Sequence, residues 1–362
     1  MTFSNVSFGD VTDNFDKKRI PLSAAQREKR QGKYRYHGAQ GVIDWVDDYI
    51  FDGTYLLIAE DGENLKSKKS NIAQLASGKF WVNNHAHVIQ CKKGYDIRYL
   101  CYLINLTDLS GYITGSAQPK LSQSSMNAIV LPMPKFEIQK EVADFIEKFD
   151  KKIQINEKVN DNLQQQASAI YQAWFEEFLL SGGSCPSTWK HGILADIANI
   201  TSGKRPSVKF FEMTENAVIP IVGAASIMGY TSESNHTDKI LVTGRVGTHG
   251  VIQRFSSPCW TSDNTLVITS DLYEYTYQLL KRIDYHSMNR GSTQPLITQS
   301  DMNKVPILIP DSETLNNFEL LAGKLMEQYQ SNLLESRKLA ELRDTLLPKL
   351  ISGEIDVSNL QL

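Results

Sequence analysis

A repeated block of twenty residues constrains the fold of this chain more than any other feature. The segment Gly115–Pro134 recurs as Gly291–Pro310, with 9 of the 20 positions identical and a constant offset of 291 − 115 = 176. A gap-free repeat of this length indicates an internal duplication. We therefore expect two related folding units in one chain.

Weaker matches extend the duplication toward the start of each unit. The sequence FGDV near the N-terminus resembles LADI from Leu194, and both precede a basic stretch that contains a proline. Gly38 matches Gly223 with an offset of 223 − 38 = 185, and Gly62 matches Gly247 with the same offset. The second unit should therefore begin close to Leu194.

Short segments rich in β-branched and aromatic residues occur in both units. Gly, Asn, Asp or Ser bound them, which is typical of β-strands with tight connections. Each unit then continues with a helical pattern, and we expect two α+β domains with a helix packed on the strands. The expected strands are 54–59, 79–84, 86–91, 239–244 and 264–270, and the expected helices are 95–106 and 272–283.

Each copy of the repeated block is followed by a long segment with helical periodicity. Phe136–Leu180 contains neither Pro nor Gly, and its apolar positions alternate spacings of four and three over more than four heptads. This pattern predicts a coiled-coil helix of about 45 residues, or about 68 Å. The segment 312–352 repeats the pattern, although Gly323 and Pro348 are expected to interrupt it.

The order of these segments predicts how the two helices pair. The second domain joins the end of the first helix to the start of the second, so the pair should be antiparallel with an approximate two-fold axis. Asn156 and Asn332 are related by 332 − 156 = 176 and should then face each other. A buried Asn pair would fix the register of the helices, although two solvated asparagines explain the sequence equally well.

These patterns predict a chain of the α+β class. It contains two tandem domains, each followed by a long helix, and the two helices form an antiparallel coiled coil with pseudo-two-fold symmetry. The expected boundaries are 1–135 for the first domain, 136–182 for the first spacer helix, 183–311 for the second domain, and 312–362 for the second helix and the C-terminal tail.

Bulk composition excludes several classes of protein. The chain has no run of eighteen apolar residues and no signal-peptide pattern, so we expect a cytoplasmic protein without a membrane span. The four cysteines form no CxxC pair and do not match between the units, which argues against a zinc site or a disulfide framework. The net charge of −3 gives no global indication of nucleic acid, so any DNA-binding surface must be local.

One such local surface is predicted between Lys17 and Arg35. Eight cationic residues in this stretch face a single acid, Glu28. Tyr34 and His37 lie among or next to them, and aromatic side chains beside cations suit a nucleic-acid surface. The stretch is compatible with phosphate contacts and equally with a solvated loop.

Motifs of catalysis are missing from the sequence. It contains no GxxxxGK[ST] loop, no GxGxxG and no Pro-Pro pair of the kind that an amino-methyltransferase motif requires. Ser262, Asp263 and His249 could be hydrolase parts, but their strand-and-turn setting lacks a nucleophile elbow. We expect no catalytic residues and no cofactor.

Two histidines have the spacing of a metal site. His85 and His87 flank Ala86, so in a β-strand their side chains would share one face. No third ligand is evident, and the second unit has no matching pair. We therefore expect a structural or DNA-contacting role for them, and no metal.

The order of several segments resembles a known family. These are VTGRVGTHGVIQRF at Val242–Phe255, GSTQPLIT at Gly291–Thr298 and the tail Leu333–Val357. Together with the duplication, they resemble specificity subunits of type I restriction-modification enzymes. The resemblance covers essentially the whole chain. It implies a non-catalytic subunit with two target recognition domains, each reading one half of a split, asymmetric site on double-stranded DNA.

The same resemblance implies partners. The long helices would space the two domains and dock adenine methyltransferase subunits, which in turn join an ATP-driven restriction subunit. Two other functions are compatible with the layout. One is a coiled-coil scaffold whose end domains bind proteins, and the other is the specificity subunit of a methyltransferase-nuclease of another restriction type.

DNA reading needs long donors, amides and small polar groups in loops. Each residue of this kind is also typical of an ordinary solvent-exposed loop that binds no ligand. The candidates in the first domain are Lys33, Arg35, His37, Gln40, Asn83, His85, Gln118 and Lys120, and those in the second domain are Lys204, Arg205, Ser226, Arg245, Thr248, His249, Asn264 and Gln294.

Overall fold

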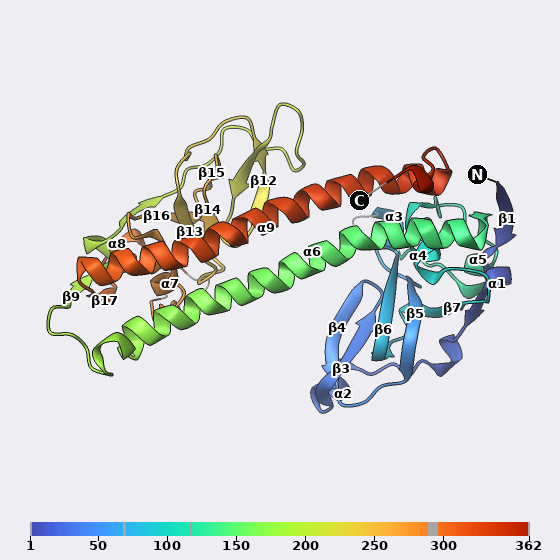
Figure 1. Cartoon of the computed structure of the whole chain (residues 1–362), viewed down its shortest axis with the longest axis horizontal. Coiled ribbons are helices and arrows are strands. Elements are labelled where there is room, and N and C mark those ends of the chain that lie inside the picture. Colours follow the sequence, from blue (N-terminus) through green and yellow to red (C-terminus); the bar gives the residue numbers. More distant parts are fainter. Residues whose placement is uncertain (1, 68–69, 116–117, 289–295, 361–362) are drawn as a thin grey trace. The chain divides into compact units, whose positions relative to one another are not determined.

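The computed structural model describes residues 2–67, 70–115, 118–288 and 296–360. The chain separates into two compact units, residues 1–155 with 335–362, and residues 156–334. Each unit contains one α+β domain and parts of both long helices, α6 (Phe136–Tyr171) and α9 (Ser312–Ser352). The duplicated α+β architecture expected from the repeat is confirmed (Figure 1).

A mixed six-stranded sheet forms the first domain. Only β3 and β6 run parallel, and the other neighbours are antiparallel. A separate ribbon pairs β1 (Phe3–Ser7) with β8 (Val130–Pro134) just before α6. The sheet order is β2 (Thr12–Asn14), β7 (Ala86–Cys91), β5 (Phe51–Ala59), β6 (Ala73–Val82), β3 (Gln31–Gly38) and β4 (Gly41–Val46).

Short helices complete this domain, and one longer helix packs on the sheet. That helix, α4 (Ile97–Leu106), begins at Asp96, whose carboxylate accepts the backbone N–H groups of Arg98 and Tyr99. Such a side-chain cap satisfies donors that a helix start leaves free. The others are α1 (Phe8–Val11), α2 (Ala24–Glu28), α3 (Asn64–Ser67), α5 (Gln123–Asn127) and the 3₁₀ turn Asp16–Lys18.

The second domain contains two sheets and a ribbon. Helix α7 (Tyr273–Leu280) takes the place of α4, and α8 (Gln299–Asn303) precedes the last strand. The four-stranded sheet is β10 (Asn199–Ser202), β16 (Thr265–Thr269), β13 (Ile240–Gly244) and β14 (Gln253–Phe255). The three-stranded sheet is β12 (Ile227–Thr231), β11 (Ile219–Val222) and β15 (Trp260–Thr261), and the ribbon pairs β17 (Pro306–Ile309) with β9 (Lys190–Ile193).

The two domains share their strand registers. Ala59 at the end of β5 pairs with Ala86 of β7, and Gly244 at the end of β13 pairs with Thr265 of β16. The offsets are 244 − 59 = 185 and 265 − 86 = 179. The same offsets convert every pair of β5 and β7 into a pair of β13 and β16. Residues can therefore be matched between the domains by backbone pairing alone.

One strand differs between the domains. In the first domain β6 is continuous and bridges β5 to β3. Its counterpart in the second domain is divided into β14, which pairs with β13, and β15, which pairs with β11. Trp81 and Trp260 occupy the same register in the two versions, since 260 − 81 = 179. The division of this strand turns one sheet into two.

Both faces of the first sheet are buried along residues 55–59 of β5, which explains the continuous apolar run of this strand. Leu56 and Ile58 face a core that α4 shares with parts of both long helices, including Phe149 of α6 and Leu350 of α9. The alternate residues of β5 face a second cluster around Phe80. The core of the second unit likewise joins β13, β16 and α7 to parts of α6 and α9.

The long helices pair antiparallel within each unit, as the connectivity predicted. In the first unit Arg343 of α9 contacts Asp150 of α6 at 2.7 Å. In the second unit Asn156 and Asn332 are 2% and 6% exposed, and the Asn156 side chain donates to the Asn332 carbonyl at 3.5 Å. The Asn332 side chain donates to Asn160 Oδ1 at 2.9 Å. The buried asparagine pair is confirmed, and Asn160 joins it.

The first long helix is shorter than expected. Regular α-helix ends at Tyr171, a π-helical turn follows at Gln172–Glu176, and Phe178 adopts a left-handed conformation with φ 53°. The prediction of a helix to Leu180 was wrong. Packing explains the change, because Phe175 and Phe178 turn onto the ring of Trp189. The π-turn adds the rotation that this contact requires.

The second long helix is less interrupted than expected. It runs from Ser312 to Ser352 through both Gly323 and Pro348, so the predicted interruptions do not occur. Pro348 lies in the last turns, where it removes one backbone donor. Neighbouring Leu347 and Leu350 are buried in the core of the first unit, and this burial holds the helix in register across the proline.

The Asn seam gives a test of the helix pairing. We expect Asn332→Ala to lower the free energy of unfolding by about 1–3 kcal/mol, because it leaves the buried Asn160 without its donor. The measurement is the urea midpoint of the full chain. The matched control is Asn162→Ala, an exposed Asn on α6, which should change little. Equal effects of the two variants would contradict a role for the seam.

Candidate nucleic-acid interface

Loops from distant parts of the first domain meet at the end of β5. We call residues 16–20, 38–41, 60–62, 83–85 and 118–121 the first loop cluster. The Glu60 N–H donates to the His85 carbonyl at 2.9 Å, and the Leu121 N–H donates to the Glu60 carbonyl at 2.8 Å. The Asn83 N–H donates to the His37 carbonyl at 3.0 Å. Backbone bonds therefore hold three of the five loops together and tie one of them to the end of β3.

The second domain has an equivalent group of loops at the end of β13. We call residues 202–205, 223–226, 245–250, 261–264 and 296–298 the second loop cluster. The Arg245 N–H donates to the Asn264 carbonyl at 2.8 Å, and the Ile297 N–H donates to the Arg245 carbonyl at 3.0 Å. These bonds repeat those of Glu60, so the two clusters share one backbone scaffold.

Four predicted residues of the first domain meet in the first loop cluster. His85 contacts Asp61 at 2.8 Å, and Lys120 contacts Glu60 at 3.3 Å. The Gln40 side chain donates to Asn64 Oδ1, whereas Asn83 Oδ1 accepts the His85 N–H. Gln40, His85 and Lys120 are exposed, so their free edges can reach a ligand.

The repeated Gly-Ser-x-Gln loop lies at the border of this cluster. Gln118 is exposed. Gly115 has φ +85°, and a Cβ at that position would approach the Gln118 carbonyl to 2.2 Å. The first glycine of the motif is therefore required by the turn. In the second copy, Gln294 lies outside the described residues.

The three other candidates of the first domain lie elsewhere. His37 is 3% exposed, and its ring meets Phe80 edge-on at 5.4 Å between centroids. Burial, followed by the charge of Arg35, lowers the pKa of His37 to about 4, so the ring is neutral. The Arg35 guanidinium donates to the Ser77 carbonyl, and Lys33 lies over Tyr34. These contacts place Arg35 and Lys33 along β3 and outside the first loop cluster.

The described candidates of the second domain all belong to the second loop cluster. Lys204 joins it through its N–H, which donates to the Thr261 carbonyl at 2.9 Å, and Ser226 accepts the Gly223 N–H at 2.8 Å. His249 contacts the Gly244 carbonyl at 3.1 Å. The remaining members are Arg205, Arg245, Thr248 and Asn264, of which Arg205, Thr248 and Asn264 are exposed.

The basic stretch Lys17–Arg35 is partly used inside the domain. Arg19 contacts Glu60 at 2.9 Å, Arg27 contacts Asp44 at 2.8 Å, and Arg30 contacts Asp47 at 2.8 Å. Half-buried pairs of this kind orient the loop and neutralise its charge. The lysines of the stretch and Arg35 are the cations left for an outside phosphate.

An ion-pair network that sequence patterns did not reveal underlies the first loop cluster. His87 Nδ1 lies 2.5 Å from Asp16 Oδ2, and His87 Nε2 lies 2.8 Å from the Leu121 carbonyl. Both partners are acceptors, so the ring satisfies them when both nitrogens carry a proton. Arg19 adds contacts to Glu60 and to Asp16. The network ties three loops of the cluster to β7.

Two carboxyl groups of the network have lowered pKa values. Burial would raise the pKa of Asp16, but hydrogen bonds from His87 and from the Val88 N–H outweigh it. Burial likewise opposes the lowering at Glu60, where the Arg19 guanidinium dominates. Both groups are therefore carboxylates at neutral pH, and their charges are balanced by Arg19 and Lys120.

The network also contains the residue types of a metal site. Asp16, Glu60 and His87 place ligand atoms within 4.8 Å of one another. A cation there would have to displace Arg19 from Glu60 and replace the contact of His87 Nδ1 with Asp16. These contacts favour an internal ion-pair network. His85, the other histidine of the expected pair, has a separate partner in Asp61.

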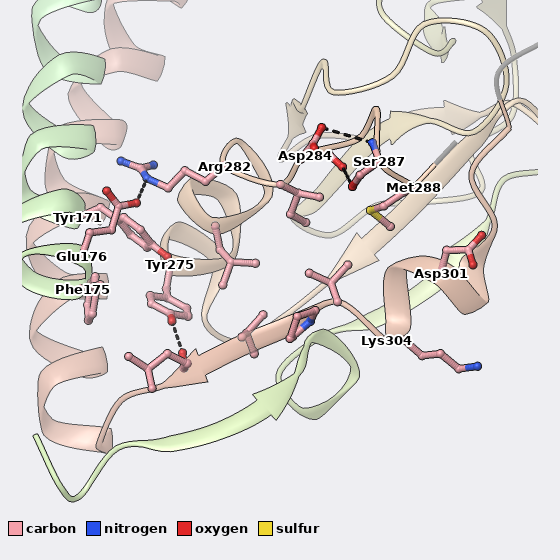
Figure 2. A pocket seen from close by; sticks show the side chains of 16 residues that line it. Tyr171, Phe175, Glu176, Tyr275, Arg282, Asp284, Ser287, Met288, Asp301 and Lys304 are labelled. Atoms are coloured by element: carbon pink, nitrogen blue, oxygen red, sulfur yellow. Dashed lines mark hydrogen bonds and ion pairs between the residues drawn. The ribbon is translucent and has the colours of Figure 1, made fainter. Parts of the chain in front are cut away.

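A cavity of about 650 Å³ lies in the second unit, apart from the loop cluster (Figure 2). It separates the end of α6 from β17, and its wall includes the ion pair of Arg282 with Glu176 and the Tyr275 hydroxyl, which donates to the Leu308 carbonyl. Asp284 and Asp301 add carboxylates, and Lys304 adds one further cation. This excess of negative charge disfavours a polyanion.

Comparisons with known proteins agree with this architecture. A model of the type I restriction modification DNA specificity domain matches residues 2–165 and 186–343, and the chain therefore belongs to this family. It is 28% identical to a type I restriction enzyme MjaIX specificity subunit from Methanocaldococcus jannaschii, over 84% of this chain and 80% of that protein. It is 23% identical to a type I restriction enzyme HindI specificity subunit from Haemophilus influenzae, over 98% and 95%.

A solved structure has a similar fold. The S subunit of a type I restriction-modification system from M. genitalium aligns with a TM-score of 0.63 at 15% identity, over 97% of this chain and 96% of that one.

Among the described helices, none combines the length and the apolar character that a membrane span requires.

The Asp16 network predicts a pH-dependent loss of stability. We expect Asp16→Asn to lower the free energy of unfolding by about 1–3 kcal/mol at pH 7, because the amide cannot accept from both His87 and the Val88 N–H. A lowered carboxyl pKa stabilises the fold above the ordinary pKa, and this contribution is lost as the pH falls through the lowered value. The difference between variant and wild type should therefore shrink at pH 3.

Urea unfolding at both pH values measures this effect. Asp13→Asn is the matched control, since Asp13 is exposed on β2, three residues before Asp16, and it should change little at either pH. An Asp16→Asn deficit that is equally large at pH 3 would show that the carboxylate charge has no part in it.

Proposed function

We propose that the chain is the DNA sequence-specificity subunit of a type I restriction-modification complex. The first and second loop clusters each read one half of a bipartite, asymmetric site on double-stranded DNA. We propose the domain boundaries expected from the sequence. The recognition domains are residues 1–135 and 183–311, and the spacer segments are residues 136–182 and 312–362. Membership of the specificity-domain family and the names of the relatives support this proposal.

One observation carries the proposal. The two loop clusters share the same backbone hydrogen bonds but present different side chains, with Gln40, His85 and Lys120 in one and Lys204, Arg245 and Asn264 in the other. Amides and cations of this kind recognise base edges and phosphates. A common scaffold with different side chains suits two readers of different half-sites.

We propose that His37 takes no part in contact, because it is buried. The proposed contact residues are the exposed candidates of the two clusters, together with Arg245 and His249. Lys33 and Arg35 lie on β3, where they would serve as phosphate contacts at the side of the first reader.

Partners are proposed to dock on the long helices. Exposed apolar side chains on α9 include Leu333, Leu334 and Leu342, and those on α6 include Ile155 and Val159. Exposed apolar residues along a coiled coil are suited to further helices. We propose adenine methyltransferase subunits as their partners, with a restriction subunit joining through the assembled complex. Methylation and cleavage would then belong to these partners, and this chain would carry no active site.

A gel-shift assay tests the function. Random-sequence duplexes are presented to the full chain, with and without a co-purified methyltransferase, at several salt concentrations. We expect the retained duplexes to become enriched in one split sequence when the partner is present. A coiled-coil scaffold that binds only proteins would retain no DNA selectively, and absence of selective binding even with the partner would contradict the proposal.

The variant Leu334→Asp separates partner effects from DNA effects in this assay. Leu334 is 55% exposed on α9 and lies outside both loop clusters. The variant should lose the methyltransferase on a sizing column while keeping its salt-dependent affinity for DNA.

A further inference from the structure

Glu60 and Arg245 are structural equivalents with opposite charge. Each donates its N–H to the residue before β7 or β16, and each accepts from the loop that precedes α5 or α8. Their offset, 245 − 60 = 185, is also the offset between β5 and β13. The backbone is therefore the same at both positions, and only the side chain changes from a carboxylate to a guanidinium.

The residues around this position also lose negative charge in the second domain. Asn14 pairs with Ile89 in the first domain, and Ile200 pairs with Ile268 in the second. Ile89 and Ile268 are equivalent, since 268 − 89 = 179, so Asn14 corresponds to Ile200 with an offset of 200 − 14 = 186. The same offset places Ser202 at the position of Asp16. An offset of 179 likewise places Leu266 at the position of His87. The second domain therefore has neither the two carboxylates nor the histidine that form the ion-pair network of the first domain.

The result is an open, basic pocket in the second domain. It has a volume of about 600 Å³ and is lined among others by Ser202, Arg245, Gln299, Ser300 and Lys304. Among the described residues, no Asp or Glu lines it. Arg245 Nε is buried without a hydrogen-bond partner. A buried donor without an acceptor is costly, which marks it as a group that a ligand can satisfy.

We propose that Arg245 and Lys304 form a phosphate-binding pocket with the hydroxyls of Ser202 and Ser300, and that its ligand is one phosphate of the DNA backbone. A guanidinium presents a fork of donors that matches a phosphate, and a lysine adds a point charge. The assignment of the phosphate to DNA rests on the proposed function. In the described part of the first domain, Arg19 occupies the equivalent position between Asp16 and Glu60.

Inorganic phosphate tests the pocket without DNA. Thermal unfolding of the full chain is followed with increasing phosphate, against chloride at the same ionic strength. Phosphate should raise the midpoint of the wild type and of Arg245→Lys, but not that of Arg245→Gln. Ser202→Asp restores the carboxylate that the first domain has and should abolish the effect. Equal stabilisation of wild type and Arg245→Gln, or none in the wild type, would overturn the pocket.

The salt dependence of DNA binding tests the source of the phosphate. The slope of log K against log salt changes by about 0.9 for each phosphate that a cation neutralises. Arg245→Gln should therefore reduce the slope by about 1. Lys281→Gln, which removes an exposed cation of the same domain that lies outside the pocket, should leave it unchanged. Circular dichroism of each variant confirms that it folds.

The two experiments separate the proposals. An unchanged DNA slope in Arg245→Gln, in a chain that binds DNA, overturns the assignment of the phosphate to DNA, while the proposed function stands. If the wild type binds no DNA at all, the proposed function fails, and the assignment to DNA fails with it. The phosphate titration then decides whether the pocket takes a free phosphate.

Discussion

The pairing between the strand that ends at Ala59 and the strand that begins at Ala86 positions the first loop cluster. This ladder, with its counterpart between Gly244 and Thr265, brings together loops that are far apart in the chain. The backbone bonds of Glu60 and Arg245 then fix how those loops pack. A side chain on these loops can change without moving its neighbours, which is the property that a reader of variable sequences needs.

The two domains use this common backbone in different ways. In the first, Asp16, Glu60 and His87 form a half-buried ion-pair network around Arg19. In the second, the same positions carry no carboxylate, and Arg245 faces an open pocket. At these positions the two domains therefore share their backbone and differ in charge. Duplication supplied two equal scaffolds, and substitution at a few positions made them unequal.

Much of the fold could be predicted from the sequence, because its determinants are local. The repeated block at Gly115–Pro134 revealed the duplication, and apolar periodicity located both long helices. The end of α6 was missed, because the turn at Phe175 depends on a contact with Trp189 that no local pattern encodes. The continuity of α9 through Pro348 was missed for a similar reason, since burial in a distant core maintains it.

The candidate site was only partly predictable. Gln40, His85 and Lys120 lie in loops as expected, whereas Lys33, Arg35 and His37 lie in β3. The burial of His37 depends on how β3 packs against Phe80. The Asp16 network could not be seen, because its members become neighbours only through non-local strand pairing. The charge reversal at Glu60 and Arg245 was accessible in principle. The offset of 185 that relates Gly62 to Gly247 also relates these two residues.

Two unlike readers on one duplicated scaffold should recognise two unlike half-sites. Mapping the adenines methylated by the complex assembled with this chain tests it most directly. We expect one split motif with two different halves, and replacement of residues 190–309 by another second domain should change one half and preserve the other. A palindromic or unbroken motif, or a change in both halves, would contradict it.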